Sequence, residues 1–402
     1  MFEDLQAKAS KVKDPMYFID WLEGNVLELG VWKQARETLI GVQNKVYAVA
    51  QFSSIPQSAK WHSEGSTLAD HVTRIIAGVI ALQSGAKLWN IDEFARYKNL
   101  QFEVTELEEI ICENAATLIA FALVHDIGKT VTVWTDTPKG SKGEAEGFKQ
   151  NKRRSRREAS EEEMYRYLKL YRAFFTKHSN LSNRQVCAKF FDEYEIEVHY
   201  SGHARVGASD KFLEAREAVA DIYRLTERDR AMLTWLVRNH MDAISFFKDS
   251  PDLSKFELMK ARANKAGFDA DDALDLLVAA LFLDATVGSL QYKEGVFNTD
   301  FKSILNFLLA EEIVAPQRGE ARRARIKQAE KERIRKYLLS SGLSADEVFS
   351  ILQIPFGPNR AGVMDKVFAL AHDQTQEIDF GEHTSEMAGR LNKARLLLTR
   401  NP

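Results

Sequence analysis

An aspartate, Asp284, stands in the middle of one of the most apolar stretches of this chain, LVAALFLDATVGSL. An ionised carboxylate is costly to bury unless a cation or hydrogen-bond donors meet it. A divalent metal ion is one such partner, because its charge outweighs the other charges around it. Any fold for this chain must therefore bring positive charge or donors to the middle of this segment.

The remaining sequence favours helices. A chain of 402 residues with 45% hydrophobic content can bury one large core or two moderate ones. There are only 8 prolines, and the glycines lie between apolar stretches and do not punctuate short strands. We therefore expect an all-α protein.

Charge and cysteine content exclude several classes of protein. The net charge of -3 gives no reason to expect nucleic acid or an anionic membrane as a partner without a local patch. Cys112 and Cys187 lie far apart, which argues against a disulfide framework or a thiolate zinc site. The N-terminus lacks an apolar signal region, and no stretch reaches about 18 uncharged apolar residues. We expect a cytoplasmic protein without a membrane span.

Apolar residues at spacings of three and four predict the helices. Residues 1–60 are expected to form an N-terminal helical extension. Ser66 or Thr67 can cap a helix through DHVTRIIAGVIALQ, with His71 in its first turns. A second helix is predicted from Glu106 to about Val124, ending at HDIGK so that Lys129 points out of its C-terminus. Further helices are expected at 182–195, 207–219, 226–239, 271–289 and 301–313.

Two charged segments divide the chain. Residues 136–163 contain almost no apolar side chains, and we expect an exposed insertion there. Acidic residues follow its basic run at once, so a solvated insertion is favoured over a dedicated RNA site. A boundary near Pro316 precedes a C-terminal helical region, 316–402, which opens with a charged helix. The basic run comprises Lys152, Arg153, Arg154, Arg156 and Arg157.

Four histidines with polar or acidic neighbours accompany Asp284. They are His71, His125 with Asp126, His203 and His240. Imidazole and carboxylate ligands together suit Mn, Fe, Ni, Co, Zn or Mg. Adjacent residues on a helix project about 100° apart, and a carboxylate can bridge two ions through its two oxygens.

The other histidines are interpreted as structural. An isolated His-Asp pair is more often a salt bridge or a helix cap than a metal site. His372-Asp373 is therefore interpreted as a solvated helix end, His178 and His199 as surface residues, and His383 as a loop residue.

The order of these motifs resembles the HD-domain metal-dependent phosphohydrolase superfamily. WHSEGSTLADHV, HDIGK, YSGHARVGASDKF and LTWLVRNHMD are most similar to the HD domain of bacterial CCA-adding tRNA nucleotidyltransferases. ILQIPFGPNRAGVMDKVFAL is similar to an element further downstream in those enzymes. The resemblance covers roughly residues 60 to 290 and implies an HD-domain helical bundle over 61–315.

The resemblance also implies a ligand set. His71, His125, Asp126 and Asp284 match the basic metal site, while His203 and His240 match the extra histidines of members that hold a second ion. The nucleotidyltransferase domain that precedes this module in those enzymes has no counterpart in the residues ahead of it, so CCA addition is not expected.

Other polar residues near these motifs are candidates for substrate contacts. Lys129 can bind a phosphate oxygen or assist the leaving group, or it can simply favour a helix C-terminus. His62 and Glu64 are expected to line the pocket. Arg205 and Arg238, each two residues from a predicted ligand, are expected to clamp phosphate.

These features together predict an enzyme. The favoured function is a phosphodiesterase or phosphatase acting on nucleotides or on RNA or DNA termini, with 2′,3′-cyclic phosphates as a substrate class. Deoxynucleotide hydrolysis is an alternative, as is a nucleic-acid or partner-binding module with a structural metal site. The same ligands also suit the redox iron chemistry of some superfamily members. The metal, the substrate and the oligomeric state remain open at this stage.

Overall fold

The computed structural model describes residues 30–86, 88, 101–149 and 158–314. The chain divides into two units, Met1–Val314 and Ala315–Pro402, and every described residue belongs to the first. Several predictions therefore concern residues outside the described ones. They are the first half of the N-terminal extension, the basic run 152–157, the C-terminal region 316–402, His372-Asp373 and His383.

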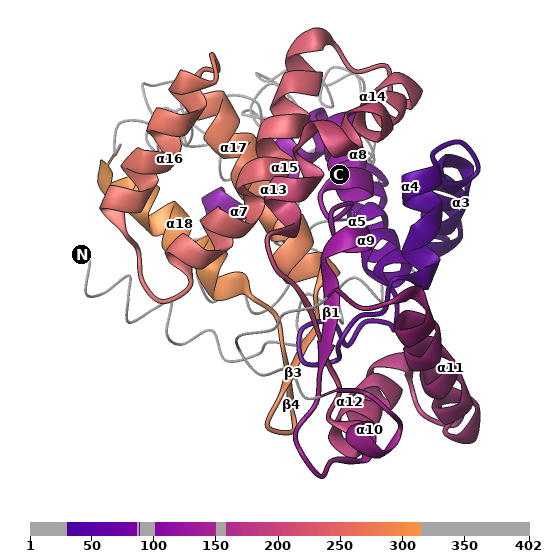
Figure 1. Ribbon diagram of the computed structural model, residues 1–402. Helices are drawn as coiled ribbons and strands as arrows, with labels where there is room; N and C mark the ends of the chain where they lie inside the picture. The colour runs from indigo at the N-terminus through magenta and orange to yellow at the C-terminus, as the bar shows by residue number, and fades with distance from the viewer. Residues whose placement is uncertain (1–29, 87, 89–100, 150–157, 315–402) are drawn as a thin grey trace, which may run out of the picture. The chain divides into compact units, whose positions relative to one another are not determined.

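The described part of the chain is an all-α fold, as predicted. Helices make up most of it, and its strands form only two short antiparallel ribbons (Figure 1). The helical body contains α3 (Val31–Gln43), α4 (Tyr47–Ala50), η1 (Gln51–Ser54), α5 (Leu68–Gln83), α7 (Gln101–Glu113), α8 (Ala115–Val124), α9 (Lys129–Thr132), α13 (His203–Gly207), η2 (Asp210–Phe212), α14 (Leu213–Ile222), α15 (Glu227–Phe247), α16 (Leu253–Lys265), α17 (Ala270–Leu281), η3 (Phe282–Gly288) and α18 (Phe301–Val314).

Helix α5 is central to this body. Thr67 is its N-cap, and the Asp70 carboxylate accepts hydrogen bonds from the Thr67 amide at 3.0 Å and hydroxyl at 2.8 Å. This capping box satisfies donors that the first turn leaves without partners. The residues from Val72 to Leu82 are buried on every side of the helix, which packs against α3, α8 and η3. His71 is therefore held in the first turn of a fully buried helix.

The segment before HDIGK differs from the prediction. The expected single helix is two, because α7 ends at Glu113 and α8 begins at Ala115 after a turn at Asn114. The window Ala115–Thr132 is long and apolar enough to cross a membrane by length and composition, but 78% of it is buried inside the protein. Its apolar character is that of a core segment.

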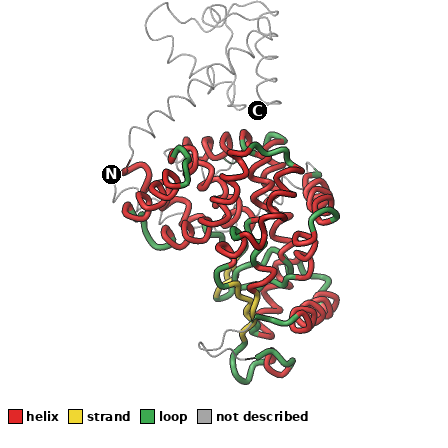
Figure 2. Tube along the Cα trace, turned by 45° about the horizontal axis from the view of Figure 1, so that its top comes forward, coloured by secondary structure: helices red, strands yellow, loops and turns green. Residues whose placement is uncertain are grey.

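A sub-domain is inserted between two paired strands. β1 (Val133–Asp136) pairs antiparallel with β2 (Glu197–Tyr200), and the chain between them forms α10 (Lys142–Ala145), α11 (Glu161–Lys177) and α12 (Asn183–Tyr194). These helices lie below the main body in Figure 1, and Figure 2 shows the strands between the two. Their own core is largely aromatic: the Phe190 ring makes edge contacts with Tyr167, Tyr171 and Phe174.

Most of residues 136–149 are exposed, as predicted, but the segment is folded onto the sub-domain. Phe148 is buried in the sub-domain core, and the Ser141 hydroxyl caps α10 by accepting from the Glu144 amide at 3.1 Å. One aromatic side chain and a helix cap thus fold a segment whose composition is almost wholly polar.

A second ribbon, missed in the sequence, connects the body and the sub-domain. β3 (Gln291–Lys293) and β4 (Val296–Asn298) form a hairpin whose two turn residues, Glu294 and Gly295, both have positive φ. The Tyr292 amide donates to the Lys60 carbonyl at 3.2 Å, and its hydroxyl donates to the Asp192 carboxylate at 2.6 Å. The hairpin thereby fixes a turn of the body against α12.

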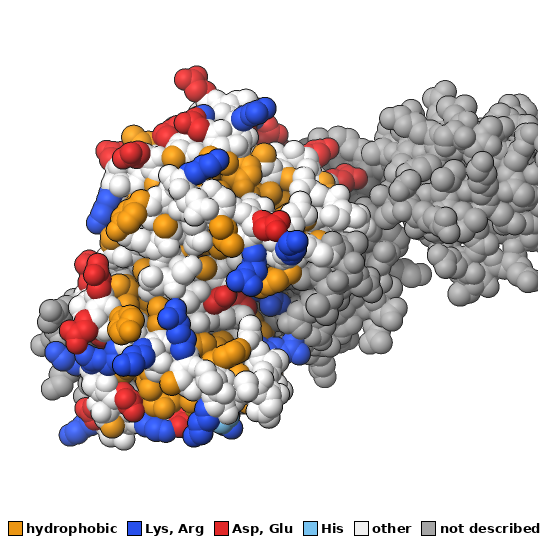
Figure 3. All heavy atoms as spheres, turned by 90° about the vertical axis from the view of Figure 1, so that its right-hand side faces the viewer, with side chains coloured by type: hydrophobic (Ala, Val, Ile, Leu, Met, Phe, Trp, Pro, Cys, Tyr) orange, Lys and Arg blue, Asp and Glu red, His pale blue; other side chains and the backbone are white. Residues whose placement is uncertain are grey.

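The surface drawn in Figure 3 carries both signs of charge among hydrophobic side chains. Neither sign covers this face alone, as a net charge of -3 leads one to expect.

The two cysteines differ in environment and should differ in reactivity. Cys187 is buried, and burial raises the pKa of its thiol to about 12, whereas Cys112 is exposed. At pH 8 only about one Cys187 thiol in 10⁴ would be ionised, and the thiolate is the reactive form. We expect one rapidly titrating thiol per native chain with Ellman's reagent and two in denaturant. Cys112→Ser should abolish the rapid phase, and two rapid thiols in the native chain would contradict the described sub-domain core.

Candidate metal centre

The structure brings the six predicted ligands together although they come from distant segments. The turn between α8 and α9 supplies two of them, and four separate elements supply one each. They are His125 and Asp126 from the turn, His71 from α5, His203 from α13, His240 from α15 and Asp284 from η3. All six are buried.

One half of the cluster surrounds the Oδ1 atom of Asp284. His71 Nε2 lies 3.1 Å from this oxygen and His125 Nε2 lies 3.6 Å from it. The two Nε2 atoms are 3.4 Å apart, and Asp126 Oδ2 is 3.3 Å from His125 Nε2. Three elements thus direct two nitrogens and two carboxylate oxygens at one small volume.

The other half lies at the second oxygen of Asp126. His203 Nε2 is 3.0 Å from Asp126 Oδ1 and His240 Nε2 is 3.9 Å from it. These two nitrogens are also 3.4 Å apart. Asp126 therefore directs one oxygen to each half of the cluster.

Oxygen acceptors determine which nitrogen each histidine presents to the cluster. The Nδ1 atoms of His125, His203 and His240 lie 2.8–3.1 Å from the backbone carbonyls three residues earlier in the chain. His71 Nδ1 lies 3.1 Å from Glu64 Oε1 and 3.2 Å from the Gly288 carbonyl. A carbonyl only accepts, so a neutral ring carries its proton on Nδ1 and turns the Nε2 lone pair toward the cluster, as metal-binding histidines do.

Lone pairs facing each other at 3.4 Å require a cation between them, and the residues present fit a divalent metal on this ground. Without a metal, protons take that place. Burial lowers the pKa of His125, but Asp126 and Asp284 outweigh it and raise the pKa to about 10. Burial lowers the pKa of His240 to about 3, with the charge of His203 acting in the same direction. This buried cluster can hold a metal ion.

The backbone around Asp284 is adapted to this position. η3 is π-helical, an irregularity that is common at functional sites, and it directs Asp284 toward the first turn of α5. Gly288 allows the close approach, because a Cβ there would lie 2.5 Å from the Ile75 side chain and 3.2 Å from His71 Cε1. The predicted helix over 271–289 is thus α17 followed by this wider turn.

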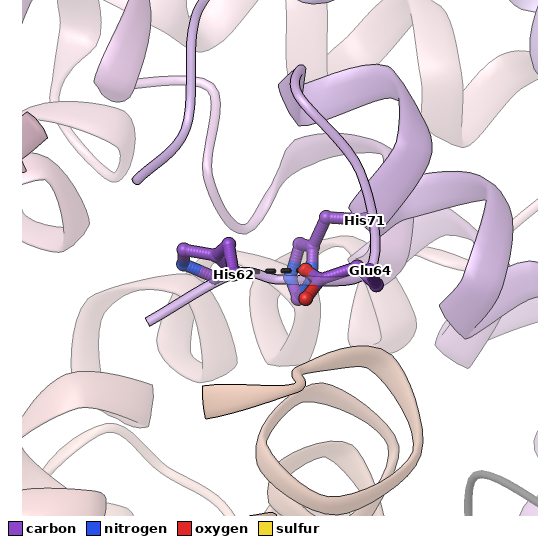
Figure 4. Close-up of side chains that lie close together, drawn as sticks. All are labelled: His62, Glu64 and His71. Carbon is purple, nitrogen blue, oxygen red and sulfur yellow. Dashed lines mark hydrogen bonds and ion pairs between the residues drawn. The ribbon is translucent and has the colours of Figure 1, made fainter. Parts of the chain in front are cut away.

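Glu64 supports His71 from behind the cluster. Figure 4 shows His62 and Glu64 on the loop that precedes the helix bearing His71. Glu64 Oε1 lies 2.9 Å from His62 Nδ1 and 3.1 Å from His71 Nδ1, and Oε2 accepts from the Leu290 amide at 2.9 Å. Burial raises the pKa of Glu64, but its two histidine partners outweigh this and lower the pKa to about 2. This carboxylate therefore orients His71.

Lys129 is buried beside Asp126 and does not point out of a helix end, which corrects the sequence-based prediction. Its ammonium lies 2.6 Å from Asp126 Oδ2, 3.3 Å from Gln57 Oε1 and 3.4 Å from His62 Nε2. The ring of Tyr200 lies below it, with 4.7 Å between the ammonium and the ring centroid. Lys129 is the first residue of a new short helix, α9, and so does not stand at the C-terminal end of α8.

A cavity of about 830 Å³ opens onto the cluster, which is within the size range of small-ligand sites. Asp126, Lys129, His203 and Asp284 lie on its wall, as does His62. Because cluster residues form part of its wall, the cluster is accessible from the cavity.

Three predicted substrate-binding residues do not line this cavity. Glu64 is buried behind His71, and Arg205 and Arg238 are exposed. The reason is geometric: residues two apart on a helix project about 200° apart, so an inward-pointing ligand turns its second neighbour outward. Arg205 and Arg238 thus lie outside the cavity wall, and the phosphate clamp assigned to them stays a prediction.

Sequence reasoning also missed part of the cavity wall. Trp61, Tyr200, Lys248 and Lys302 line it, as does His199, which was interpreted as a surface residue. His199 stacks on Trp134 with 4.1 Å between ring centroids. Strand alternation over 197–200 was the available signal, but four residues are too few to stand out from their surroundings.

Comparisons of the chain with protein families, with curated proteins and with solved structures found no match.

Gly128 should be essential for the cluster geometry. A Cβ there would collide with the His203 carbonyl and lie 2.8 Å from the Gly207 amide. We expect Gly128→Ala to destabilise the protein by about 1–3 kcal/mol and to lower its metal content, measured by thermal unfolding and elemental analysis. Gly41→Ala, in open space on α3, is the matched control and should stabilise by about 0.5–1 kcal/mol. An unchanged metal content in Gly128→Ala would contradict the described contact of α9 with α13.

Metal binding should release protons. In the metal-free protein the pKa of His125 is raised from 6.5 to about 10 and that of His71 is also raised, so His125 is protonated near neutral pH. Their favourable charge interactions are complete below pH 6.5 and are lost as the pH rises through about 10. A metal needs the neutral rings, so its affinity should rise with pH over this window. Titration calorimetry in buffers of different ionisation enthalpy should show a release of about one proton or more, and a heat independent of buffer would contradict this.

Proposed function

We propose that this protein is an HD-type phosphohydrolase that uses two divalent metal ions to cleave phosphoesters of nucleotides or of nucleic-acid termini. The observation that carries the proposal is the position of Asp126. Its Oδ1 lies 3.0 Å from His203 Nε2 and its Oδ2 lies 3.3 Å from His125 Nε2, so one carboxylate serves both halves of the cluster. A bridging carboxylate between two histidine-rich halves is the arrangement that two-metal hydrolysis requires.

The residues divide into two sets. His71, His125 and Asp284 would hold one ion, His203 and His240 the other, and Asp126 would bridge them. When bound, two such ions ionise a water near neutral pH and stabilise charge on phosphoryl oxygens. Mn, Fe, Ni, Co, Zn and Mg all accept these donors.

Charged side chains on the cavity wall support a phosphoryl substrate. Lys129 places a buried ammonium within hydrogen-bond distance of Asp126, where it can also face a phosphate oxygen. His62 Nε2 lies 3.4 Å from the same ammonium, and burial together with Lys129 lowers the pKa of His62 to about 4. His62 is thus neutral beside the cavity and can exchange hydrogen bonds with the substrate or with water.

The proposed substrate class fits the dimensions of the cavity. A volume of about 830 Å³ accommodates one nucleotide with its phosphate at the cluster. A nucleotide and the terminal residue of a strand present the same groups to such a cavity. We therefore propose phosphomonoesters and 2′,3′-cyclic phosphodiesters of nucleosides as substrates.

Asp126→Ala should abolish activity, because it removes an oxygen ligand from both halves at once. Wild-type protein purified without chelator should contain about two metals per chain. With added Mn²⁺, Ni²⁺ or Co²⁺ it should hydrolyse bis-p-nitrophenyl phosphate or 2′,3′-cyclic AMP, and the variant should lose on the order of 10³-fold or more in kcat.

Asp272→Ala is the matched control. This aspartate is exposed, pairs with Arg228 at 2.7 Å and lies away from the cavity wall, so its loss should leave kcat unchanged. A folded, metal-loaded wild type that cleaves none of these esters would refute hydrolysis and favour a binding module or redox chemistry. A wild type without metal would refute the metal centre itself.

A further inference from the structure

The cavity mouth carries a partly exposed aromatic side chain, Trp61. It follows Ser58 in a tight turn and lines the same cavity as Asp126 and Asp284. About 38% of its surface remains exposed, so part of the ring is open to a ligand. An indole on the wall of a cavity is a surface on which a flat ligand group can stack.

The backbone under Trp61 is firmly fixed. The amides of Trp61 and His62 donate to the Ser58 carbonyl at 3.0 Å and 2.8 Å, and the Lys60 carbonyl accepts from Tyr292 of β3. The Ser63 amide donates to the Leu290 carbonyl at 2.6 Å. Hydrogen bonds from both ends of this turn therefore hold the backbone of Trp61 in place on the cavity wall, so little ordering of the turn is needed when a ligand binds.

Cations flank the indole. The Lys60 ammonium lies 5.5 Å from the ring centroid and is itself held by Glu197 at 2.6 Å. The Lys248 ammonium lies 6.0 Å from the ring, is exposed, and forms no ion pair within the described part of the chain. Lys248 can therefore turn away from the ring at little cost and meet an anionic group of an entering ligand.

Other flat and charged groups share this wall. His199, whose ring stacks on Trp134, lies on it together with the Tyr200 ring and Lys302. The cavity wall thus includes the cluster, which can bind a phosphoryl group, lysine side chains that can meet further negative charge, and the Trp61 ring. A nucleoside phosphate is the ligand class that has a group for each of these.

We propose that Trp61 determines the preference of this site for nucleoside phosphates over sugar phosphates. Its indole stacks on the base of a nucleoside phosphate whose phosphoryl group lies at the metal cluster. This rests on the proposed function, because the phosphoryl end is placed by the cluster. Stacking tolerates any base, so the site should accept all four bases, whether on a free nucleotide or at the end of a strand.

Comparing ligands with and without a base separates the contribution of the base to the affinity from that of the phosphate. We would measure, by stopped flow and before turnover, the affinities of the full-length, Mn²⁺-loaded protein for AMP, GMP, CMP and UMP and for ribose 5-phosphate, which lacks a base. The wild type should bind the nucleotides about tenfold more tightly than the sugar phosphate. In Trp61→Ala the nucleotides should bind no more tightly than ribose 5-phosphate, whose own affinity should not change. Trp61→Phe should retain part of the preference for nucleotides. A dinucleotide with a terminal phosphate, tested beside AMP, distinguishes a strand end from a free nucleotide by which one binds more tightly.

Trp32→Ala is the matched control, since Trp32 is 37% exposed on α3 and does not line the cavity. It should leave every ratio unchanged. Equal nucleotide-to-sugar ratios in wild type and Trp61→Ala would overturn the stacking proposal, and so would a wild type without preference for nucleotides. A different result would refute the proposed function. If wild type and Asp126→Ala bind ribose 5-phosphate with the same affinity, the cluster does not bind the phosphoryl group.

Discussion

The ion pair between Asp126 and Lys129 joins the parts on which the site depends. The carboxylate is buried, and burial alone would raise its pKa, but the charges of His125, Lys129 and His203 outweigh this and hold its pKa well below the ordinary value. A buried charge remains ionised only when its surroundings supply opposite charge and hydrogen bonds. The partners of Asp126 lie on α13, in the turn before α9 and at the start of α9. Asp126 therefore stays ionised only when these elements pack together, and its charge in turn stabilises their packing. Asp284 repeats the pattern with His125 and His71.

Two β-ribbons connect this charged centre to the cavity in an otherwise helical protein. β2 ends at Tyr200, whose carbonyl lies 2.9 Å from His203 Nδ1 and whose ring lies under Lys129. The β3–β4 hairpin follows directly after η3, and Tyr292 connects it to Lys60 and to Asp192. The inserted sub-domain is thus anchored at both ends beside the cluster. A strand ribbon is stiffer than a loop of the same length, because its backbone groups pair across the ribbon. The cavity wall is therefore set by backbone hydrogen bonds as well as by helix packing.

The cluster and the cavity differ in how far sequence could predict them. Asp284 stood out because a carboxylate in so apolar a stretch is expensive to bury. The full set of His71, His125, Asp126, His203, His240 and Asp284 was implied by the resemblance of the motifs to the HD-domain superfamily. Helices such as α15 and α18 were found because their apolar spacing is regular. The break at Asn114, the folding of 136–149 and the hairpin after η3 were missed, since each depends on a turn or cap of a few residues that leaves no periodic hydrophobic pattern. Arg205 and Arg238 lie outside the cavity wall, because proximity to a ligand in sequence is not proximity in space.

The sequence by itself determined the helical class and the set of residues that must be buried together, because hydrophobic spacing and the cost of buried charge are local properties. Only the tertiary structure decided that Asp126 directs one oxygen to each pair of histidines, that Glu64 and Lys129 point inward, and that Trp61 lies at the cavity mouth. The direction of a side chain depends on the rotation of its helix or turn against neighbours far away in the chain. A change of two residues along a helix reverses that direction, and no local pattern specifies it.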